Sequence, residues 1–263
     1  MRRAPDSTAA GERERTETTA VEGEPTVRIL AIDTATEACS AAVLDSFDRL
    51  FGRYEEPGRG HAERILALID AVLAESQLTL AGLDAIAFGR GPGGFTGARL
   101  AASIAQGLAF AQGLPVVPVS DLRALAQRAL DVAPEARSIL ACADARMREV
   151  YWGCFRRGTR GLAEPFASGE HVSPPDAVEL VEGLEEPIHG VGRGFMAYAQ
   201  LEAKLGGRLG AIHDELLPRA AEIARLAAAD FAAGLAVEAE RALPVYLRDE
   251  VARPPAGSPA SRD

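Results

Sequence analysis

Residues 27–44 read VRILAIDTATEACSAAVL and contain two short apolar runs separated by a polar stretch. The first run, residues 27–33, is rich in β-branched and aliphatic side chains and predicts a buried strand, and residues 39–45 predict another. The polar DTATEA between them is turn-like. Residues 49–54, RLFGRY, predict a third strand. Three strands at such short spacing indicate an antiparallel meander.

After the meander, the spacing of the apolar residues becomes helical. The elements expected in the rest of the first half are a helix over 61–78, a strand over 83–90, a helix over 98–113, a strand over 115–120 and a helix over 121–130. Ser120 or Asp121 is suited to cap the last of these helices.

The second half repeats this plan. Its expected elements are strands over 138–144 and 149–155, a helix over 173–183, a strand over 187–192, and helices over 195–205 and 218–234. Two halves that open with strands and pass into β–α alternation predict an α/β protein with two related lobes. We expect the first lobe to span residues 27–130 and the second 131–253, with the last helix able to pack back on the first lobe.

The charge and cysteine content of the 263 residues exclude several classes of protein. The chain has 28 basic and 38 acidic residues, so its formal net charge is −10. Such a balance argues against a protein that holds nucleic acid phosphates by its own bulk charge. No apolar run reaches the roughly 18 residues that a membrane helix needs. The three cysteines lack C-x-x-C spacing and indicate neither a disulfide framework nor a zinc site, so a reducing cytoplasm is expected.

The two ends of the chain differ in composition from the body. Residues 1–26 have no aromatic side chain and one β-branched aliphatic, Val21, so we expect a disordered tail. No apolar segment follows their first arginines, unlike a signal peptide. A further hypothesis is that translation starts at Val27, which would leave residues 1–26 untranslated. Residues 254–263 are polar and predict a second flexible tail.

The segment with the densest glycine content is GRGPGGFTG, residues 89–97. One interpretation is an anion cradle, because the loop feeds a helix N-terminus with free N–H groups. The spacing fits neither a P-loop nor a dinucleotide fingerprint. The alternative interpretation is a tight strand-to-helix turn, which the spacing favours.

The helix that follows this loop has no polar face. Between Gly97 and Gly113 its one charged residue is Arg99, and most other side chains are small. A helix of this kind is buried on all sides. It lies either at the centre of the core or with one face covered by another chain, and both alternatives stay open at this point.

Acidic residues end the first predicted strand of each half. Asp33 is followed by Thr34 and Thr36, and could orient a metal-bound water or a phosphate, although an Asx turn is the simpler interpretation. Asp144 repeats this placement, which predicts that two lobes face a shared cleft. No two histidines have H-x-x-x-H spacing, so no helix presents two imidazoles to one metal.

Four segments together resemble one known family. ILAIDTATEACSAAVL, GRGPGGFTGARLAASIAQGLA, ADARMREVYWGCF and PVYLRDEVA are similar to motifs of the TsaB (YeaZ) family, and the resemblance covers roughly residues 27–253. The resemblance implies an actin/Hsp70-like fold, with two lobes of RNase H-like topology that each carry a mixed sheet and helices. The same α/β, two-lobed plan follows from the pattern of strands and helices.

The resemblance also implies a function in tRNA modification. Members of this family are non-catalytic dimerisation subunits of the bacterial complex that transfers a threonylcarbamoyl group to adenosine 37 of ANN-decoding tRNAs. The implied partners are the paralogue TsaD, which transfers the group, the ATPase TsaE, which docks on the pair, and TsaC, which supplies threonylcarbamoyl-adenylate. ATP or ADP and a metal ion are expected in the partner subunits, and tRNA binds through the complex. No cofactor, metal or catalytic residue is expected in this chain alone.

The resemblance assigns two sets of residues. The partner contact carries over onto Gly93, Phe95, Thr96, Arg99, Leu100, Ser103 and Ile104. The loop with Asp33, Thr34 and Thr36 takes the place of a phosphate loop in active relatives. It reads D-T-A-T rather than D-x-G-T, so it is interpreted as vestigial.

Three other hypotheses remain. An autonomous actin-like ATPase or kinase would turn over ATP as an isolated chain. A metallopeptidase would need metal ligands, which metal analysis would detect. The apolar helix could also serve a homodimer when TsaD is absent, and sedimentation with and without TsaD separates that case.

Overall fold

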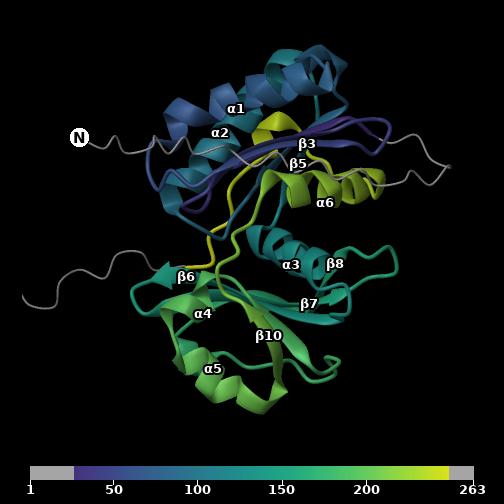
Figure 1. Ribbon diagram of the computed structural model, residues 1–263. Coiled ribbons are helices and arrows are strands. Elements are labelled where there is room, and N and C mark those ends of the chain that lie inside the picture. The colour runs from purple at the N-terminus through teal and green to yellow at the C-terminus, as the bar shows by residue number, and fades with distance from the viewer. Residues whose placement is uncertain (1–26, 249–263) are drawn as a thin grey trace, which may run out of the picture.

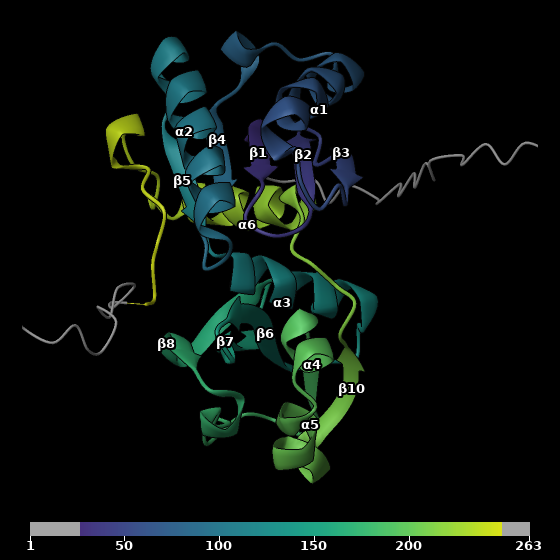
Figure 2. The same cartoon turned by 90° about the vertical axis from the view of Figure 1, so that its left-hand side faces the viewer.

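Two mixed β-sheets, one in each half of the chain, form the framework of the protein (Figures 1 and 2). The structure is a computed structural model, and it describes residues 27–248. The predictions for residues 1–26 and 254–263, and for the last five residues of the second lobe, lie outside the described residues.

The first sheet has the strand order β3-β2-β1-β4-β5. Its strands are β1 (Ile29–Asp33), β2 (Cys39–Leu44), β3 (Leu50–Glu55), β4 (Ala85–Gly89) and β5 (Val116–Val119). The first three strands are antiparallel, with Ala31 opposite Ala42, and β4 and β5 run parallel to β1. The predicted meander is therefore confirmed.

The second sheet has the order β10-β9-β6-β7-β8. Its strands are β6 (Ser138–Arg146), β7 (Glu149–Arg157), β8 (Ala163–Ser173), β9 (Ile188–Val191) and β10 (Leu209–His213). Three antiparallel strands again precede two parallel ones, so this sheet has the same topology as the first. This duplication confirms the predicted α/β fold with two lobes, each a mixed sheet with helices.

Helices cover both faces of the first sheet. The α-helices are α1 (His61–Ser76), α2 (Phe95–Gln112), α3 (Asp121–Val132), α4 (Arg193–Ala197), α5 (Gln200–Leu205) and α6 (Ala220–Ala232). The 3₁₀ turns are Leu80–Gly82, Pro175–Ala177, Gly206–Arg208 and Ala239–Arg241. Helices α1 and α2 share one core cluster with the sheet, and α6 packs on its opposite face (Figure 1). Helix α3 packs on the second sheet and also contacts α6.

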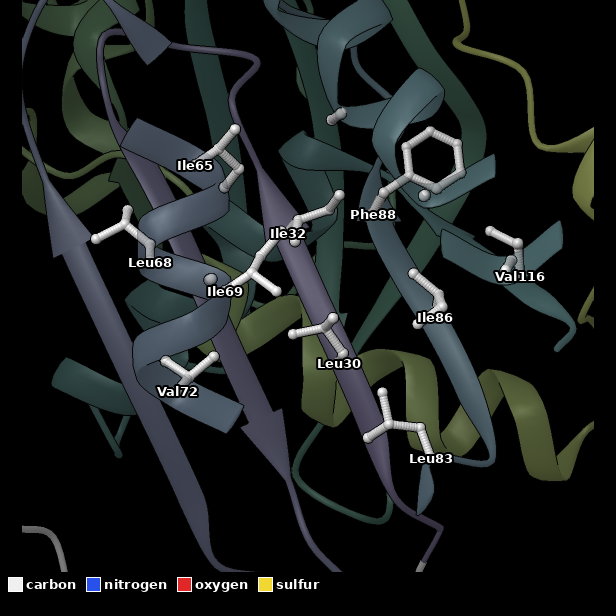
Figure 3. Packing of buried hydrophobic residues seen from close by; sticks show 14 of the residues in the cluster. Leu30, Ile32, Ile65, Leu68, Ile69, Val72, Leu83, Ile86, Phe88 and Val116 are labelled. Atoms are coloured by element: carbon white, nitrogen blue, oxygen red, sulfur yellow. The ribbon is translucent and has the colours of Figure 1, made fainter. Parts of the chain in front are cut away.

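The strand β1 is buried on both faces, which explains its unbroken apolar sequence. Leu30 and Ile32 point toward α1, where they meet Ile65 and Ile69 (Figure 3). Its other apolar side chains join the cluster beneath α6. Each fully buried aliphatic side chain of this size contributes about 1.5–3 kcal/mol to stability. The strand is thus held from two sides.

The second half departs from the sequence prediction at four places. The helix predicted over 173–183 is wrong, because only the turn Pro175–Ala177 forms and Val178 is extended. The prolines occupy the first turn, where a missing N–H costs little, so they do not account for the loss; Val178 is instead buried in a core cluster of the second lobe. The helix predicted over 195–205 is broken at Tyr198, whose backbone is extended. Strands β8 and β10 were not predicted.

One residue at the end of α1 has a left-handed backbone conformation, which allows a test of local strain. Gln77 has φ 58° and donates its N–H to carbonyls of the last turn. Glycine adopts this conformation without the cost of roughly 1 kcal/mol that a Cβ imposes. We expect Gln77→Gly to raise the free energy of unfolding by about 1 kcal/mol, measured by urea denaturation. Gln77→Ala is the control, and equal effects of the two substitutions would contradict this account.

Candidate functional site

Helix α2 has one face that the other residues between 27 and 248 leave open. Its buried face consists of alanines alone: Ala98, Ala101, Ala102, Ala105 and Ala109. On the other side Thr96, Arg99, Ser103, Gly107 and Phe110 are exposed at intervals of three or four residues. The alternative that α2 lies at the centre of the core is therefore wrong for this face. The alternative of a second chain that covers it stays a prediction.

The residues assigned to the partner contact lie on this helix or just before it. Phe95, Thr96, Arg99 and Ser103 are exposed, whereas Gly93, Leu100 and Ile104 are half-buried. Ile104 packs against the core cluster of the first sheet. The exposed members extend along one face of α2, and Phe110 prolongs that face toward the end of the helix.

An aromatic cluster stands at the start of this face. The guanidinium of Arg99 lies 3.5 Å from the centre of the Phe95 ring, and its Nε donates a hydrogen bond of 2.7 Å to the Tyr246 hydroxyl. The rings of Phe95 and Tyr246 are 5.5 Å apart. Sequence reasoning assigned no role to Tyr246, because a contact over so long a sequence separation leaves no local signal.

Tyr246 belongs to a segment, residues 237–248, that runs from the first lobe to the second. Val237 pairs with Val116 of β5, and Ala242 accepts a hydrogen bond of 3.1 Å from Gln106 of α2. At the other end Arg248 donates to the carbonyl of Ala145 at 3.2 Å and forms an ion pair with Glu149. This segment therefore contacts α2 and the β6–β7 hairpin.

The glycine-rich loop packs tightly against the loop after β1. A Cβ on Gly97 would overlap the carbonyl oxygen of Thr34, and one on Gly93 would overlap that of Ala35. The Thr34 hydroxyl donates to the carbonyl of Gly97 at 2.7 Å, and the N–H of Gly94 donates to Ala35 at 2.6 Å. These contacts account for two glycines by packing within the chain, as the strand-to-helix turn predicts.

The polar side chains of the loop after β1 are used within the chain. Asp33 Oδ1 accepts the N–H of Ala35 at 2.8 Å, which is the geometry of an Asx turn. The Thr36 hydroxyl accepts the N–H of Ala38 at 3.2 Å. The vestigial-phosphate-loop interpretation of this segment stays a prediction.

Two buried carboxyl groups lie beneath the loops that lead to α2. Asp33 and Asp121 are 0% and 2% exposed. Burial raises the pKa of Asp33 to about 6 and raises the pKa of Asp121 well above its ordinary value, where the charge of Asp33 acts in the same direction. Ser120 caps α3, accepting the N–H of Arg123 at 3.1 Å, so the carboxyl of Asp121 is free for another contact.

A cleft of about 1090 Å³ separates the lobes. The loop between β1 and β2 and the β6–β7 hairpin both line it. Thr34 and Glu37 line it from the first lobe and Asp144 and Arg146 from the second. Ion pairs cross it: Arg146 lies 3.0 Å from Glu37, and Arg193 lies 2.6 Å from Glu56. Such exposed pairs contribute about 0–1 kcal/mol each, so they join the lobes only weakly.

Residues that commonly bind metal ions form no cluster in the described part of the chain. Within residues 27–248, no group of three or more His, Cys, Asp or Glu side chains could hold a metal ion. Cys39, Cys142 and Cys154 are free and buried, and burial raises the pKa of each thiol. They are therefore poor nucleophiles at neutral pH. None of the helices between residues 27 and 248 has the length and apolar character to cross a membrane.

Comparison with known proteins gives consistent matches. Residues 55–253 match the family TsaD, tRNA N6-adenosine threonylcarbamoyltransferase. The "tRNA threonylcarbamoyladenosine biosynthesis protein TsaB" of Haemophilus influenzae is 40% identical over 231 residues, which is 85% of this chain and 94% of that protein. The Escherichia coli protein of the same description is 39% identical over 226 residues, 86% of this chain and 96% of its own. The structure of "YeaZ from Pseudomonas aeruginosa" is 44% identical, with a TM-score of 0.77 over 84% of this chain and all of that chain.

Two glycines of α2 are expected to respond in opposite ways to the same substitution. Gly97→Ala forces a methyl group into the Thr34 carbonyl and should lower the free energy of unfolding by about 2 kcal/mol or more. Gly107→Ala places its methyl group in open space and should raise that free energy by about 1 kcal/mol through helix propensity. Urea denaturation measures both. A loss of stability in Gly107→Ala would show that this position is packed.

Proposed function

The chain belongs to the TsaB (YeaZ) family, and we propose that it is the non-catalytic pairing subunit of the complex that forms threonylcarbamoyladenosine in tRNA. In this proposal the open face of α2 binds a TsaD paralogue and holds it in a competent state. TsaD transfers the threonylcarbamoyl group to adenosine 37 of ANN-decoding tRNAs. TsaE docks on the pair, and TsaC supplies threonylcarbamoyl-adenylate. The complex works in the cytoplasm, with nucleotide and metal held by the partner subunits.

The observation that carries the proposal is Gly107. A glycine inside a helix costs roughly 1 kcal/mol relative to alanine. At Gly107 a Cβ would meet no other atom of the described part of the chain, so packing there does not offset this cost. The glycine lies between the exposed Ser103 and Phe110. Small residues let another helix approach closely. The face thus has the shape of a helix-packing surface.

Neighbouring elements extend this surface. Helix α1 lies beside α2 on the outer face of the first sheet and exposes Leu66 (Figure 2). Phe95 at one end of α2 is 52% exposed and Phe110 at the other is 74% exposed. Exposed apolar residues that gather on one face are typical of interaction sites. Two adjacent helices with such a face suit a helical partner surface.

The non-catalytic part of the proposal rests on the loop after β1. In an active relative the side chains of Asp33, Thr34 and Thr36 would face a phosphate; here Asp33 is fully buried with Oδ1 bonded to the N–H of Ala35, and both threonine hydroxyls are hydrogen-bonded to the backbone. A kinase or ATPase would need some of these groups free for its substrate. Turnover of ATP by the isolated chain would favour that alternative.

Ser103 offers a direct test of the pairing face. Ser103→Arg would bury an unpaired charge at the contact, and we expect its affinity for TsaD to fall by roughly 100-fold or more. The position is exposed, so the free energy of unfolding should change by less than about 0.5 kcal/mol. Ile104 is less suitable, because it also packs on the core. Co-purification and sedimentation with TsaD measure the pairing.

Ala232→Arg is the matched control. Ala232 is exposed at the end of α6, on the opposite face of the first sheet, and its substitution should leave pairing unchanged. Equal pairing of the Ser103 and Ala232 variants would contradict the assignment of the α2 face. If the isolated chain sediments as a dimer that Ser103→Arg dissociates, the same face also serves self-association.

Complementation tests the function as a whole. We expect the gene to restore threonylcarbamoyladenosine in a TsaB-depleted bacterium, with Ser103→Arg failing and Ala232→Arg succeeding. Mass spectrometry of digested tRNA reads out the modified nucleoside. A wild-type chain that pairs with TsaD of its own organism but restores no nucleoside there would overturn the proposal.

A further inference from the structure

Asp33 and Asp121 converge on one point of the backbone although they come from different elements. Asp33 ends β1 and Asp121 begins α3, and Gly89, the last residue of β4, lies between them. A Cβ on Gly89 would stand 2.9 Å from Asp33 Oδ1 and would overlap Asp121 Oδ1. The glycine therefore makes room for two carboxyl groups side by side.

One oxygen of each carboxyl group is bonded to the backbone and the other is not. Asp33 Oδ1 accepts the N–H of Ala35, and Asp121 Oδ2 accepts the N–H of Gly91. Asp33 Oδ2 and Asp121 Oδ1 are buried without a hydrogen-bond partner. Buried oxygens of this kind are costly unless they are satisfied. A proton held between the two groups would satisfy both.

The charges around the pair do not supply another partner. Glu170 of β8 is a third carboxyl group nearby, which is bonded to the Ser120 hydroxyl and lies 3.7 Å from Arg90. His61 of α1 is near enough to Asp33 to act on it electrostatically, which lowers the pKa of Asp33. Arg123 of α3 is paired with Asp230. Among residues 27–248 no arginine or lysine forms an ion pair with Asp33 or Asp121, so two ionised carboxylates here would repel each other with only His61 to offset the charge of Asp33.

We propose that Asp33 and Asp121 share one proton and act as a positioning pair for the two loops that lead to α2. Asp33 holds the N–H of Ala35, whose carbonyl accepts the N–H of Gly94 at 2.6 Å. Asp121 holds Gly91 from both sides, because its own N–H donates to the Gly91 carbonyl at 3.1 Å. The shared proton thus connects the loop after β1 to the loop before α2. Its effect on pairing rests on the function proposed above.

The shared proton implies a definite dependence of stability on pH. In the unfolded chain both carboxyl groups ionise near pH 4, whereas burial raises the pKa of Asp33 to about 6 and raises that of Asp121 well above its ordinary value. Between these values the folded state retains protons that the unfolded state has lost. The stabilisation is therefore present at low pH and is lost as pH rises through the folded pKa values.

Asp121→Asn isolates this contribution. The amide oxygen can still accept the N–H of Gly91, and the amide N–H can replace the shared proton toward Asp33. We expect the thermal midpoint of the wild-type chain to fall relative to that of Asp121→Asn as pH rises from about 5 to 8.5, with the variant more stable at the upper end. Asp70→Asn, on the exposed face of α1, is the control and should parallel the wild type.

Several results would overturn the shared proton. Parallel profiles of the wild type and Asp121→Asn would do so, as would stabilisation of the wild type but not of the variant by Mg²⁺, since a cation would then bridge the carboxylates. If Asp121→Asn does not fold, Asp33→Asn provides the same comparison. Infrared spectroscopy of the wild type at neutral pH should show a protonated carboxyl band, and its absence would also contradict the proposal.

The positioning role has its own readout. Affinity for TsaD should weaken above neutral pH in the wild type and stay level in Asp121→Asn. A level affinity in both chains, with the stability profiles still divergent, would restrict the pair to a structural role and overturn the positioning claim. Failure of the proposed function itself would appear differently, as equal pairing of Ser103→Arg and the wild type at every pH.

Discussion

Thr34 and Ala35 lie so close to the start of α2 that positions 93 and 97 have no room for a side chain, and both are glycine. This close approach is possible because β1 and β4 are parallel neighbours, so the loops after them leave the sheet at the same edge. The hydrogen bonds between the loops fix where α2 begins. The alanine face of α2 then lies flat on the sheet, and its opposite face is turned outward. The candidate partner surface depends on this one contact.

The elements that sequence predicted well are those with a strong local pattern. β1 and β2 are predominantly apolar, and α1 and α6 carry their apolar residues at helical spacing. The sequences of β8 and β10, AEPFASGEHVS and LGAIH, lack such a pattern. These strands pair through their backbones with β7 and β9, and that pairing leaves no local signal in the sequence. Between residues 173 and 183 helical spacing exists, but the burial of Val178 in a core cluster of the second lobe prevails over it.

The candidate site was predictable in part for a similar reason. The single charged residue and the many small side chains of α2 marked the helix as unusual, and Ser103 and Arg99 do lie on its open face. Burial of each position was not predictable, and Ile104 belongs partly to the core. Tyr246 and Asp121 depend on contacts across 147 and 30 residues of sequence. Such contacts exist only once the fold has formed, so no local sequence motif predicts them.

The segment 237–248 gives the molecule a mechanical property. It pairs with β5, passes beside α2, places Tyr246 on Arg99 and ends with Arg248 on the β6–β7 hairpin. A rotation of one lobe against the other would pull on Arg248 and, through the short chain to Tyr246, on the aromatic cluster at the start of α2. A change in the angle between the lobes must therefore either break the contacts of Arg248 or be transmitted along residues 246–248 to the outer helical face.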